Sequence, residues 1–126
     1  MFPLNINFQS ETPIYLQIAR ELEEAILTGI YPEETQVPST TELSTGLQIN
    51  PATVLKGMNQ LVAEQILYKK RGVGMFVCTR AAERIRTARL SEFYDRYILP
   101  MLREGERLGM AQEDLIQLIQ KGGNTQ

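Results

Sequence analysis

The chain has 126 residues, of which 43% are hydrophobic, and its formal net charge is −2. This composition excludes a disordered tail, and the length allows one domain, or a small domain with an appendage, but no large multi-domain enzyme. The sequence contains no His, no Trp and one Cys, Cys78, so an internal disulfide, a His/Cys zinc site and a histidine-dependent catalytic dyad are excluded. We therefore expect no metal site and no cofactor.

The sequence shows no targeting or membrane segment. Its first ten residues contain no Lys or Arg, and no apolar run approaches the ~18 residues that a membrane span needs. We therefore expect a cytoplasmic protein without a membrane partner. Close carboxylate pairs such as Glu23–Glu24 fall on solvated segments without a histidine or a glycine-rich phosphate loop, so we do not expect an enzyme.

The first predicted element is a helix that begins at Thr12 and Pro13. Thr is a favourable N-cap, and Pro suits the first helical position because the N–H of that position has no helical partner. Apolar residues recur at helical spacing to about Thr28, and Gly29 indicates the end of the helix. Residues 1–11 lack this period, and we expect them to form an N-terminal arm.

Two short helices separated by a tight turn are predicted next. Ser39 and Glu42 fit a capping box, in which each side chain accepts a hydrogen bond from the backbone N–H of the other residue. Asn50 followed by Pro51 predicts the start of the next helix, which runs to about Glu64. Two helices joined by so short a turn indicate a helix-turn-helix.

The two faces of the predicted helix at 51–64 differ in chemistry. The stripe expected to be buried comprises Val54, Met58, Leu61 and Val62. The opposite face comprises Thr53, Lys56, Gly57 and Gln60. A face that combines a cation, an amide and a hydroxyl with little bulk suits a groove lined with phosphates and base edges, although an ordinary solvated face has the same composition.

A short basic hairpin is predicted after these helices. Residues 67–71 and 75–77 have the composition of strands, and glycines at 72 and 74 indicate the turn between them. Lys69, Lys70 and Arg71 make its tip basic, and in a winged helix such a tip can contact the phosphate backbone or the minor groove. We therefore expect a mainly α (α+β) fold, with a winged helix-turn-helix and a β-hairpin wing over residues 1–78.

The last third, residues 79–126, predicts a C-terminal helical dimerisation segment. We expect a long amphipathic helix over about 79–108, kinked or broken near Pro100, and a shorter helix over 111–121. The same segment of a second chain is expected to cover their apolar stripes around a two-fold axis; the alternative is that the stripe folds back on the first helix. The expected interface residues are Ile85, Tyr94, Tyr97, Ile98, Met101, Leu102, Leu115 and Ile119.

Four motifs occur in a defined order between residues 13 and 77. They are P-I-Y-x-Q-I at the first helix, V-P-S-x-x-E-L at the second, N-P-A-T-V at the third and R-G-x-G-M-F-V at the wing. This order resembles the winged-helix DNA-binding domain of the GntR family of bacterial transcription regulators, and the short tail resembles the YtrA-like subfamily. The resemblance implies a homodimer, commonly a repressor, that binds a palindromic double-stranded DNA operator through residues 51–64 and the wing at 69–74.

The resemblance also implies which residues contact DNA. The contacts carried over from the family are Ser39, Thr40, Asn50, Ala52, Thr53, Lys56, Lys70, Arg71 and Gly72. We add their neighbours Thr41 and Lys69 to the expected DNA-binding residues. Thr41 and Pro51 stand where the family usually has Arg, so base readout by Arg is not expected from them. Gln48 stands where a turn glycine is common, so this turn is made either without positive φ or with a strained residue.

Two alternatives remain open at the level of the sequence. The negative net charge and the missing arginines also fit a winged-helix protein–protein interaction module without specific DNA binding. Cys78 is expected to be a small core residue, with a redox role as the alternative. The tail is too short for a dedicated ligand domain, so an effector, whose identity is unknown, would bind at the dimer cleft, between subunits, or not at all.

Overall fold

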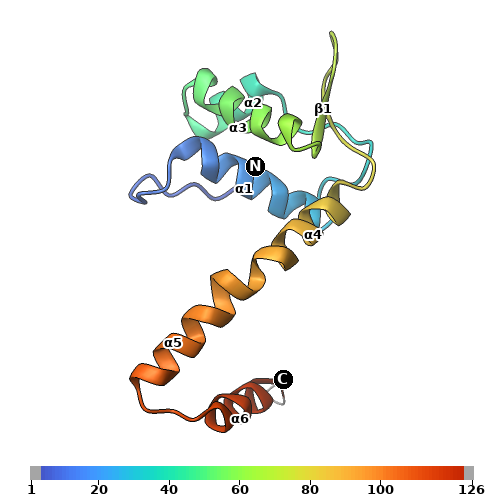
Figure 1. Cartoon of the computed structure of the whole chain (residues 1–126). Coiled ribbons are helices and arrows are strands. Elements are labelled where there is room, and N and C mark those ends of the chain that lie inside the picture. The colour runs from blue at the N-terminus through green and yellow to red at the C-terminus, as the bar shows by residue number, and fades with distance from the viewer. Residues whose placement is uncertain (1–3, 124–126) are drawn as a thin grey trace. The chain divides into compact units, whose positions relative to one another are not determined.

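The computed structural model describes residues 4–123 (Figure 1). The ends of the predicted arm (1–3) and tail (124–126) lie outside this range. In chain order the elements are α1 (Ile14–Leu27), α2 (Thr40–Leu47), α3 (Pro51–Ala63), β1 (Leu67–Lys70), β2 (Gly74–Val77), α4 (Ala81–Phe93), the π-helical segment η1 (Tyr94–Ile98), α5 (Leu99–Arg107) and α6 (Gln112–Gly123). The chain forms two compact units, Met1–Thr87 and Ala88–Gln126.

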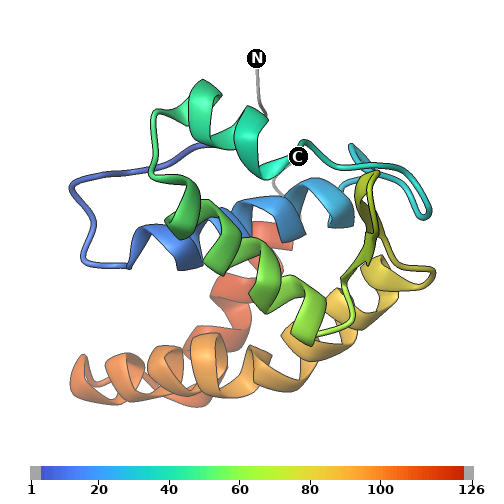
Figure 2. The same ribbon diagram turned by 90° about the horizontal axis from the view of Figure 1, so that it is seen from above.

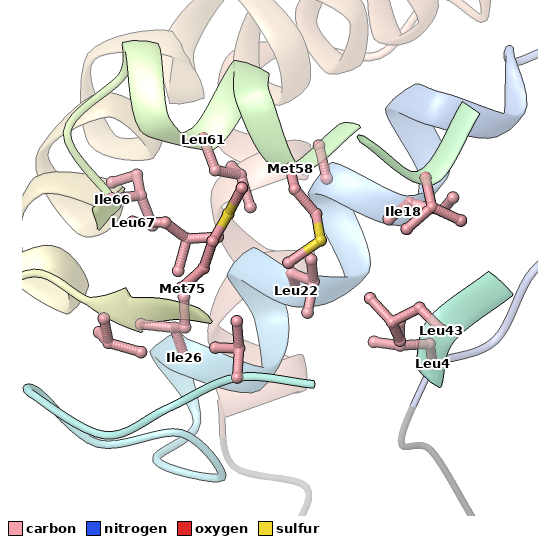
Figure 3. Close-up of a cluster of buried hydrophobic side chains, with 14 of the residues drawn as sticks. Leu4, Ile18, Leu22, Ile26, Leu43, Met58, Leu61, Ile66, Leu67 and Met75 are labelled. Carbon is pink, nitrogen blue, oxygen red and sulfur yellow. The ribbon is translucent and has the colours of Figure 1, made fainter. Parts of the chain in front are cut away.

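The first unit is the expected winged helix-turn-helix. α3 packs against both α1 and α2, and the hairpin of β1 and β2 extends toward the side of α1 on which α2 and α3 lie (Figures 1 and 2). Apolar side chains from all of these elements form one core (Figure 3). The labelled members are Leu4, Ile18, Leu22, Ile26, Leu43, Met58, Leu61, Ile66, Leu67 and Met75.

The predicted caps of α2 and α3 are confirmed, whereas the predicted start of α1 is wrong by one residue. The Glu42 N–H donates to Ser39 Oγ at 3.0 Å and the Ser39 N–H to Glu42 Oε1 at 3.0 Å, and the Ala52 N–H donates to Asn50 Oδ1 at 2.8 Å. α1 begins at Ile14, with Pro13 in the cap position and no side-chain cap. The carbonyl of Thr12 instead accepts a hydrogen bond from the Gln17 side chain at 2.9 Å.

The described part of the N-terminal arm is packed against α1. Leu4 is buried in the core, and the Asn5 N–H donates to Glu21 Oε1 at 2.9 Å. The side-chain amide of Gln17 binds the backbone of Asn7 through both of its polar atoms. Its Oε1 accepts from the Asn7 N–H, and its Nε2 donates to the Asn7 carbonyl. These pairings join residues far apart in sequence, so the lack of a period in the arm did not reveal them.

The turn between α2 and α3 uses a left-handed residue. Gln48 has φ 55° and ψ 50°, the conformation that glycine adopts without strain and that costs other residues about 1–2 kcal/mol. The adjacent Ile49 is tied to Ser44 twice, through its N–H to the Ser44 carbonyl at 3.1 Å and through its carbonyl from Ser44 Oγ at 2.6 Å. Of the two sequence alternatives for this turn, the structure therefore has the strained one.

The wing is supported by backbone hydrogen bonds from a third segment, in addition to those between its two strands. β1 and β2 pair antiparallel from Leu67–Val77 to Lys70–Gly74. The sequence predicts this hairpin, but its turn lies at 71–73 because Gly74 belongs to β2. The preceding loop also pairs with β2: the Glu34 N–H donates to the Val77 carbonyl at 2.8 Å, and the Val37 N–H donates to the Met75 carbonyl at 3.0 Å. Residues 34–37 therefore run beside β2 with an isolated bridge between Gln36 and Phe76, while the sheet itself has two strands.

In the second unit the helix is widened near Pro100 and not broken. Over η1 the backbone hydrogen bonds span five residues and not four, so that the Leu99 N–H donates to the Tyr94 carbonyl. Gly109, with φ 74°, ends the following helix. The Met110 N–H then donates to the Gly105 carbonyl at 2.8 Å and closes the helix end in a Schellman-type arrangement.

The division between the units falls later than expected. The sequence predicts a division after Cys78, whereas the compact units divide after Thr87, within α4. The reason is that Ala81 and Ile85, in the first turns of α4, are buried in the core of the first unit. Across residues 4–123, none of the helices has the length and apolar character needed to span a membrane.

Candidate nucleic-acid interface

The start of α2 offers fewer free side chains than expected. Ser39 Oγ is occupied as the cap of the helix, and Thr40 is half-buried with its hydroxyl 3.6 Å from Met58 Sδ. Thr41 is exposed. Of the three residues expected to contact DNA here, Thr41 is therefore the one whose side chain is left to a partner.

The exposed side of α3 carries Ala52 and Lys56. Asn50 is also exposed, although its Oδ1 accepts from the Ala52 N–H, so its side-chain NH₂ group is the part left for a ligand. Thr53 is half-buried. Lys56 Nζ lies 4.1 Å from the centroid of the Tyr15 ring on α1, which is a cation–π contact.

Gly57 is not on the exposed face, contrary to the sequence prediction. It is buried where α1 and α3 cross, and a Cβ added there would lie 2.6 Å from the Tyr15 carbonyl oxygen. The glycine thus allows the backbone of α1 to approach α3. The buried side of α3 therefore includes Gly57 together with Val54, Met58 and Leu61, and the exposed side differs from the predicted one accordingly.

Sequence reasoning missed two exposed residues on α3, Leu55 and Asn59. Both share the solvent side with Ala52 and Lys56, at the spacing of three and four residues that places side chains on one helical face. Leu55 is a large apolar residue and is 37% exposed. Treating Gly57 as buried would have identified this face from the sequence.

The tip of the wing is basic and exposed. Lys69, Lys70, Arg71 and Gly72 are all exposed, and Gly72 has φ 76° as the turn requires. Lys70 Nζ lies 4.4 Å from the centroid of the Phe76 ring. The turn is held from below by Gln36, whose Nε2 donates to the Val73 carbonyl at 3.0 Å.

A carboxylate at the base of the wing joins three segments. Glu34 accepts hydrogen bonds from the hydroxyls of Tyr68 and Thr79, each at 2.6 Å. The bond from Thr79, followed by that from Tyr68, lowers the pKa of the Glu34 carboxyl, and the bond to Glu34 raises the pKa of Tyr68. Near this cluster, burial raises the pKa of the Cys78 thiol, which is partly buried against the core as a small apolar residue.

The second unit exposes a large apolar surface, but two predicted interface residues are not part of it. Ile85 is 2% exposed in the core of the first unit, and Leu115 is packed against Gly105, where an added Cβ would lie 3.1 Å from Leu115 Cδ1. Both side chains are therefore already covered within the single chain. Tyr94, Tyr97 and Ile119 are exposed, whereas Ile98, Met101 and Leu102 are half-buried.

Other exposed apolar residues in this unit lie outside the set expected at the interface. They are Leu90, Phe93, Leu108, Ile116 and Leu118. Phe93 and Tyr97 lie one turn apart, with ring centroids 5.3 Å apart. Across the described range 4–123, no group of three or more Cys, Asp or Glu side chains is arranged to hold a metal ion.

The family model described as "Bacterial regulatory proteins, gntR family" matches residues 14–77, half of the chain. The chain belongs to the GntR family. This match spans α1 to β2, the elements that carry the exposed face of α3 and the wing. The family expected from the four sequence motifs is therefore confirmed.

A named transcriptional repressor resembles the chain over part of its length. The transcriptional repressor YtrA of Bacillus subtilis is 37% identical over 78 residues, which are 62% of this chain and 60% of that protein. The chain thus matches less than two thirds of the length of this relative. This relative is named as a transcriptional repressor and not as an enzyme.

Solved structures of the GntR fold resemble the chain as well. A GntR family transcriptional regulator from Listeria monocytogenes superposes with a TM-score of 0.75 at 28% identity, over 90% of this chain and 98% of that chain. The DNA-binding domain of AraR, solved in complex with an operator, superposes with a TM-score of 0.56 at 26% identity, over 62% of this chain and the whole of that chain.

Proposed function

We propose that this GntR-family protein is a sequence-specific transcription repressor that binds a palindromic DNA operator as a homodimer. The observation that carries the proposal is the first unit itself. Its α1 to β2 region matches the family, and the structurally similar AraR domain binds an operator. α3 and the wing project exposed polar and basic side chains from that region.

In this proposal α3 enters the major groove and the wing meets the backbone. Ala52, Leu55 and Asn59 face the bases, with Thr53 at the edge of the contact, and Lys56 reaches a backbone phosphate beside them. Leu55 suits the methyl group of thymine and Asn59 suits adenine, the pairings that apolar and amide side chains make in the major groove. Thr41, Asn50 and the wing cations at 69–71 with Gly72 contact phosphates, which position the protein without reading sequence.

The homodimer is proposed from the second unit. Exposed aromatic and aliphatic side chains on η1 and α6, including Tyr94, Tyr97 and Ile119, would be covered by the same unit of a second chain. Two DNA-binding units would then meet half-sites about one helical turn, ~34 Å, apart. We place this regulator in the bacterial cytoplasm, where its DNA lies, with any small-molecule effector bound between subunits.

The experiment that tests the function is DNA binding across a salt series. The probe is a duplex covering the DNA immediately upstream of the protein's own gene, with a scrambled duplex of equal composition as the control. The proposal expects two chains per duplex, preference for the upstream sequence, and an affinity that falls steeply with salt because counterions are released. Equal and weak binding to both duplexes would instead favour a protein–protein interaction module.

A further inference from the structure

Arginine is absent from the proposed DNA-binding surface except at the tip of the wing. Between Arg20 and Arg71 the sequence contains no arginine and three lysines, Lys56, Lys69 and Lys70. Arginine binds phosphate through a rigid planar fork, whereas lysine presents a point charge on a flexible stem that loses much rotamer freedom when it is fixed. A surface that depends on lysine therefore gains if the stem is fixed before DNA arrives.

Two of these three lysines are held over aromatic rings. Lys56 Nζ lies 4.1 Å from the centroid of the Tyr15 ring, and Lys70 Nζ lies 4.4 Å from the centroid of the Phe76 ring. Both distances are within the ~6 Å range of a cation–π contact. A ring covers one side of an ammonium and leaves its other N–H donors for a phosphate oxygen.

Each ring is itself held by the fold. Tyr15 is half-buried on α1, and its backbone carbonyl is in close contact with α3 at Gly57, the residue that follows Lys56. Phe76 is half-buried on β2 and stacks on Tyr68 with ring centroids 5.8 Å apart. Tyr68 is fixed in turn by its hydrogen bond to Glu34 at 2.6 Å.

We propose that Tyr15 and Phe76 are positioning residues for DNA binding, which hold Lys56 and Lys70 in place for contact with backbone phosphates. Lys69 provides a comparison within the chain. It neighbours Lys70 on β1, where successive side chains point to opposite faces, and no ring contact of Lys69 is found in the described residues 4–123. The inference rests on the proposed function, because it concerns the same DNA surface.

The test is a pair of double-mutant cycles in DNA binding, measured with the upstream duplex and the full-length protein. Tyr15→Leu should weaken binding about two- to fivefold, the effect of losing a cation–π contact at an exposed site, and Tyr15→Phe should bind as the wild type does. In the Lys56→Met background, Tyr15→Leu should cause no further loss. Phe76→Leu, Phe76→Tyr and Lys70→Met form the second cycle.

The salt dependence separates a positioning role from a structural one. Lys56→Met and Lys70→Met should each reduce the slope of log K against log salt by about 0.9, the value for one phosphate contact. Lys69→Met combined with Phe76→Leu should give effects that multiply, because Lys69 is not coupled to that ring. Melting temperatures are measured for every variant to detect loss of folding. If Tyr15→Leu does not fold, pentafluorophenylalanine is placed at position 15 instead. That residue keeps the ring but reverses its charge distribution.

The outcomes distinguish this inference from the proposed function. If removal of either ring weakens binding by the same factor with and without its lysine, the ring is only structural and the inference is overturned. Wild-type binding by the pentafluorophenylalanine variant would overturn it as well. A wild-type protein that binds neither duplex would overturn the proposed function together with the inference.

Discussion

Glu34 shows how much a single exposed residue can join. Its backbone is left-handed, with φ 63°, and its carboxylate accepts from one hydroxyl on β1 and another at Thr79, before α4. Residues with positive φ other than glycine are uncommon, and Glu34 is one of four in the described part of the chain. The local sequence at 33–35 gives no sign of either partner, because both lie more than thirty residues away.

We expect Glu34→Gln to destabilise the fold in a pH-dependent way. The hydrogen bonds lower the pKa of Glu34 in the folded state, so in acid the folded chain binds fewer protons at this site than the unfolded chain. The stabilisation is therefore present above the ordinary pKa of glutamate and is lost as the pH falls through the lowered folded value. Urea unfolding at neutral and acidic pH measures this difference.

The neighbouring carboxylate supplies the control for this experiment. Glu33 is exposed and has no hydrogen bond or ion pair in the described part of the chain, so Glu33→Gln should leave the pH dependence of unfolding as in the wild type. A gap between the wild type and Glu34→Gln that stays constant from neutral to acidic pH would contradict the assigned role of the charge.

Gly57 is required by the crossing of α1 and α3. A Cβ at this position would lie 2.6 Å from a backbone oxygen and 3.3 Å from the Ile18 side chain, and a backbone atom cannot move aside as a flexible side-chain end can. We expect Gly57→Ala to lower the free energy of unfolding by about 1–3 kcal/mol, the usual cost of overpacking, despite the better helix propensity of Ala. Denaturant unfolding followed by circular dichroism checks this value.

Gly122 in α6 is the matched position for Gly57→Ala. Nothing lies within 4 Å of a Cβ added there, so Gly122→Ala should keep or slightly raise the free energy of unfolding. If both substitutions have the same small effect, α1 and α3 can separate without cost, and the account given for the exposed face of α3 would be wrong.

At the scale of the element, η1 has a clear cause in Pro100. Proline lacks the N–H that would bond to the Arg96 carbonyl, and its ring would clash with that carbonyl in a regular α-helix. Widening the helix by one residue over Tyr94–Ile98 avoids the clash while the helix continues. The sequence predicted a disturbance at the right place, but a kink, a break and a π-turn satisfy the same local constraint.

Pro100→Ala should therefore restore a regular helix across η1. The carbonyl that accepts the Leu99 N–H should change from Tyr94 to Asp95, and the free energy of unfolding should rise by at most about 3 kcal/mol. Hydrogen-bond scalar couplings in NMR spectra identify the acceptor directly. Arg103→Ala, at an exposed position of α5, is the control, and a Leu99 amide still bonded to Tyr94 in Pro100→Ala would show that the π-turn has another origin.

At the scale of the whole molecule, self-association is the property to measure. Ile119 is 58% exposed on α6, and a carboxylate there would be buried without a partner if the second unit forms the dimer contact. We expect Ile119→Glu to weaken the dimer at least tenfold in sedimentation equilibrium, since one desolvated charge costs more than the ~1.4 kcal/mol of a tenfold change. Gln117→Glu, nearby on the same helix, should leave association unchanged, and equal behaviour of the two variants would exclude α6 from the interface.

The sequence predicted what short segments determine and missed what distant segments determine. The capping box at Ser39, the Asn50 cap and the presence of the hairpin depend on neighbours a few residues away, and all three are confirmed. The buried side of Gly57 and the placement of Ile85 depend on helices that meet only in the folded chain. The same limit applies to the proposed site, where the basic residues were identified but the rings that hold Lys56 and Lys70 were not.

The pairing of residues 34–37 with β2 has a consequence for the order of folding. A two-stranded hairpin alone is marginally stable in water, and β2 obtains its second neighbour from a segment about forty residues earlier in the chain. That loop closure must precede or accompany formation of the wing, which makes it a late and non-local step compared with the helices. Residues 34–37 precede β2 in the chain, so the hydrogen bonds between them form only after β2 has been synthesised, and the base of the wing is completed by a non-local contact.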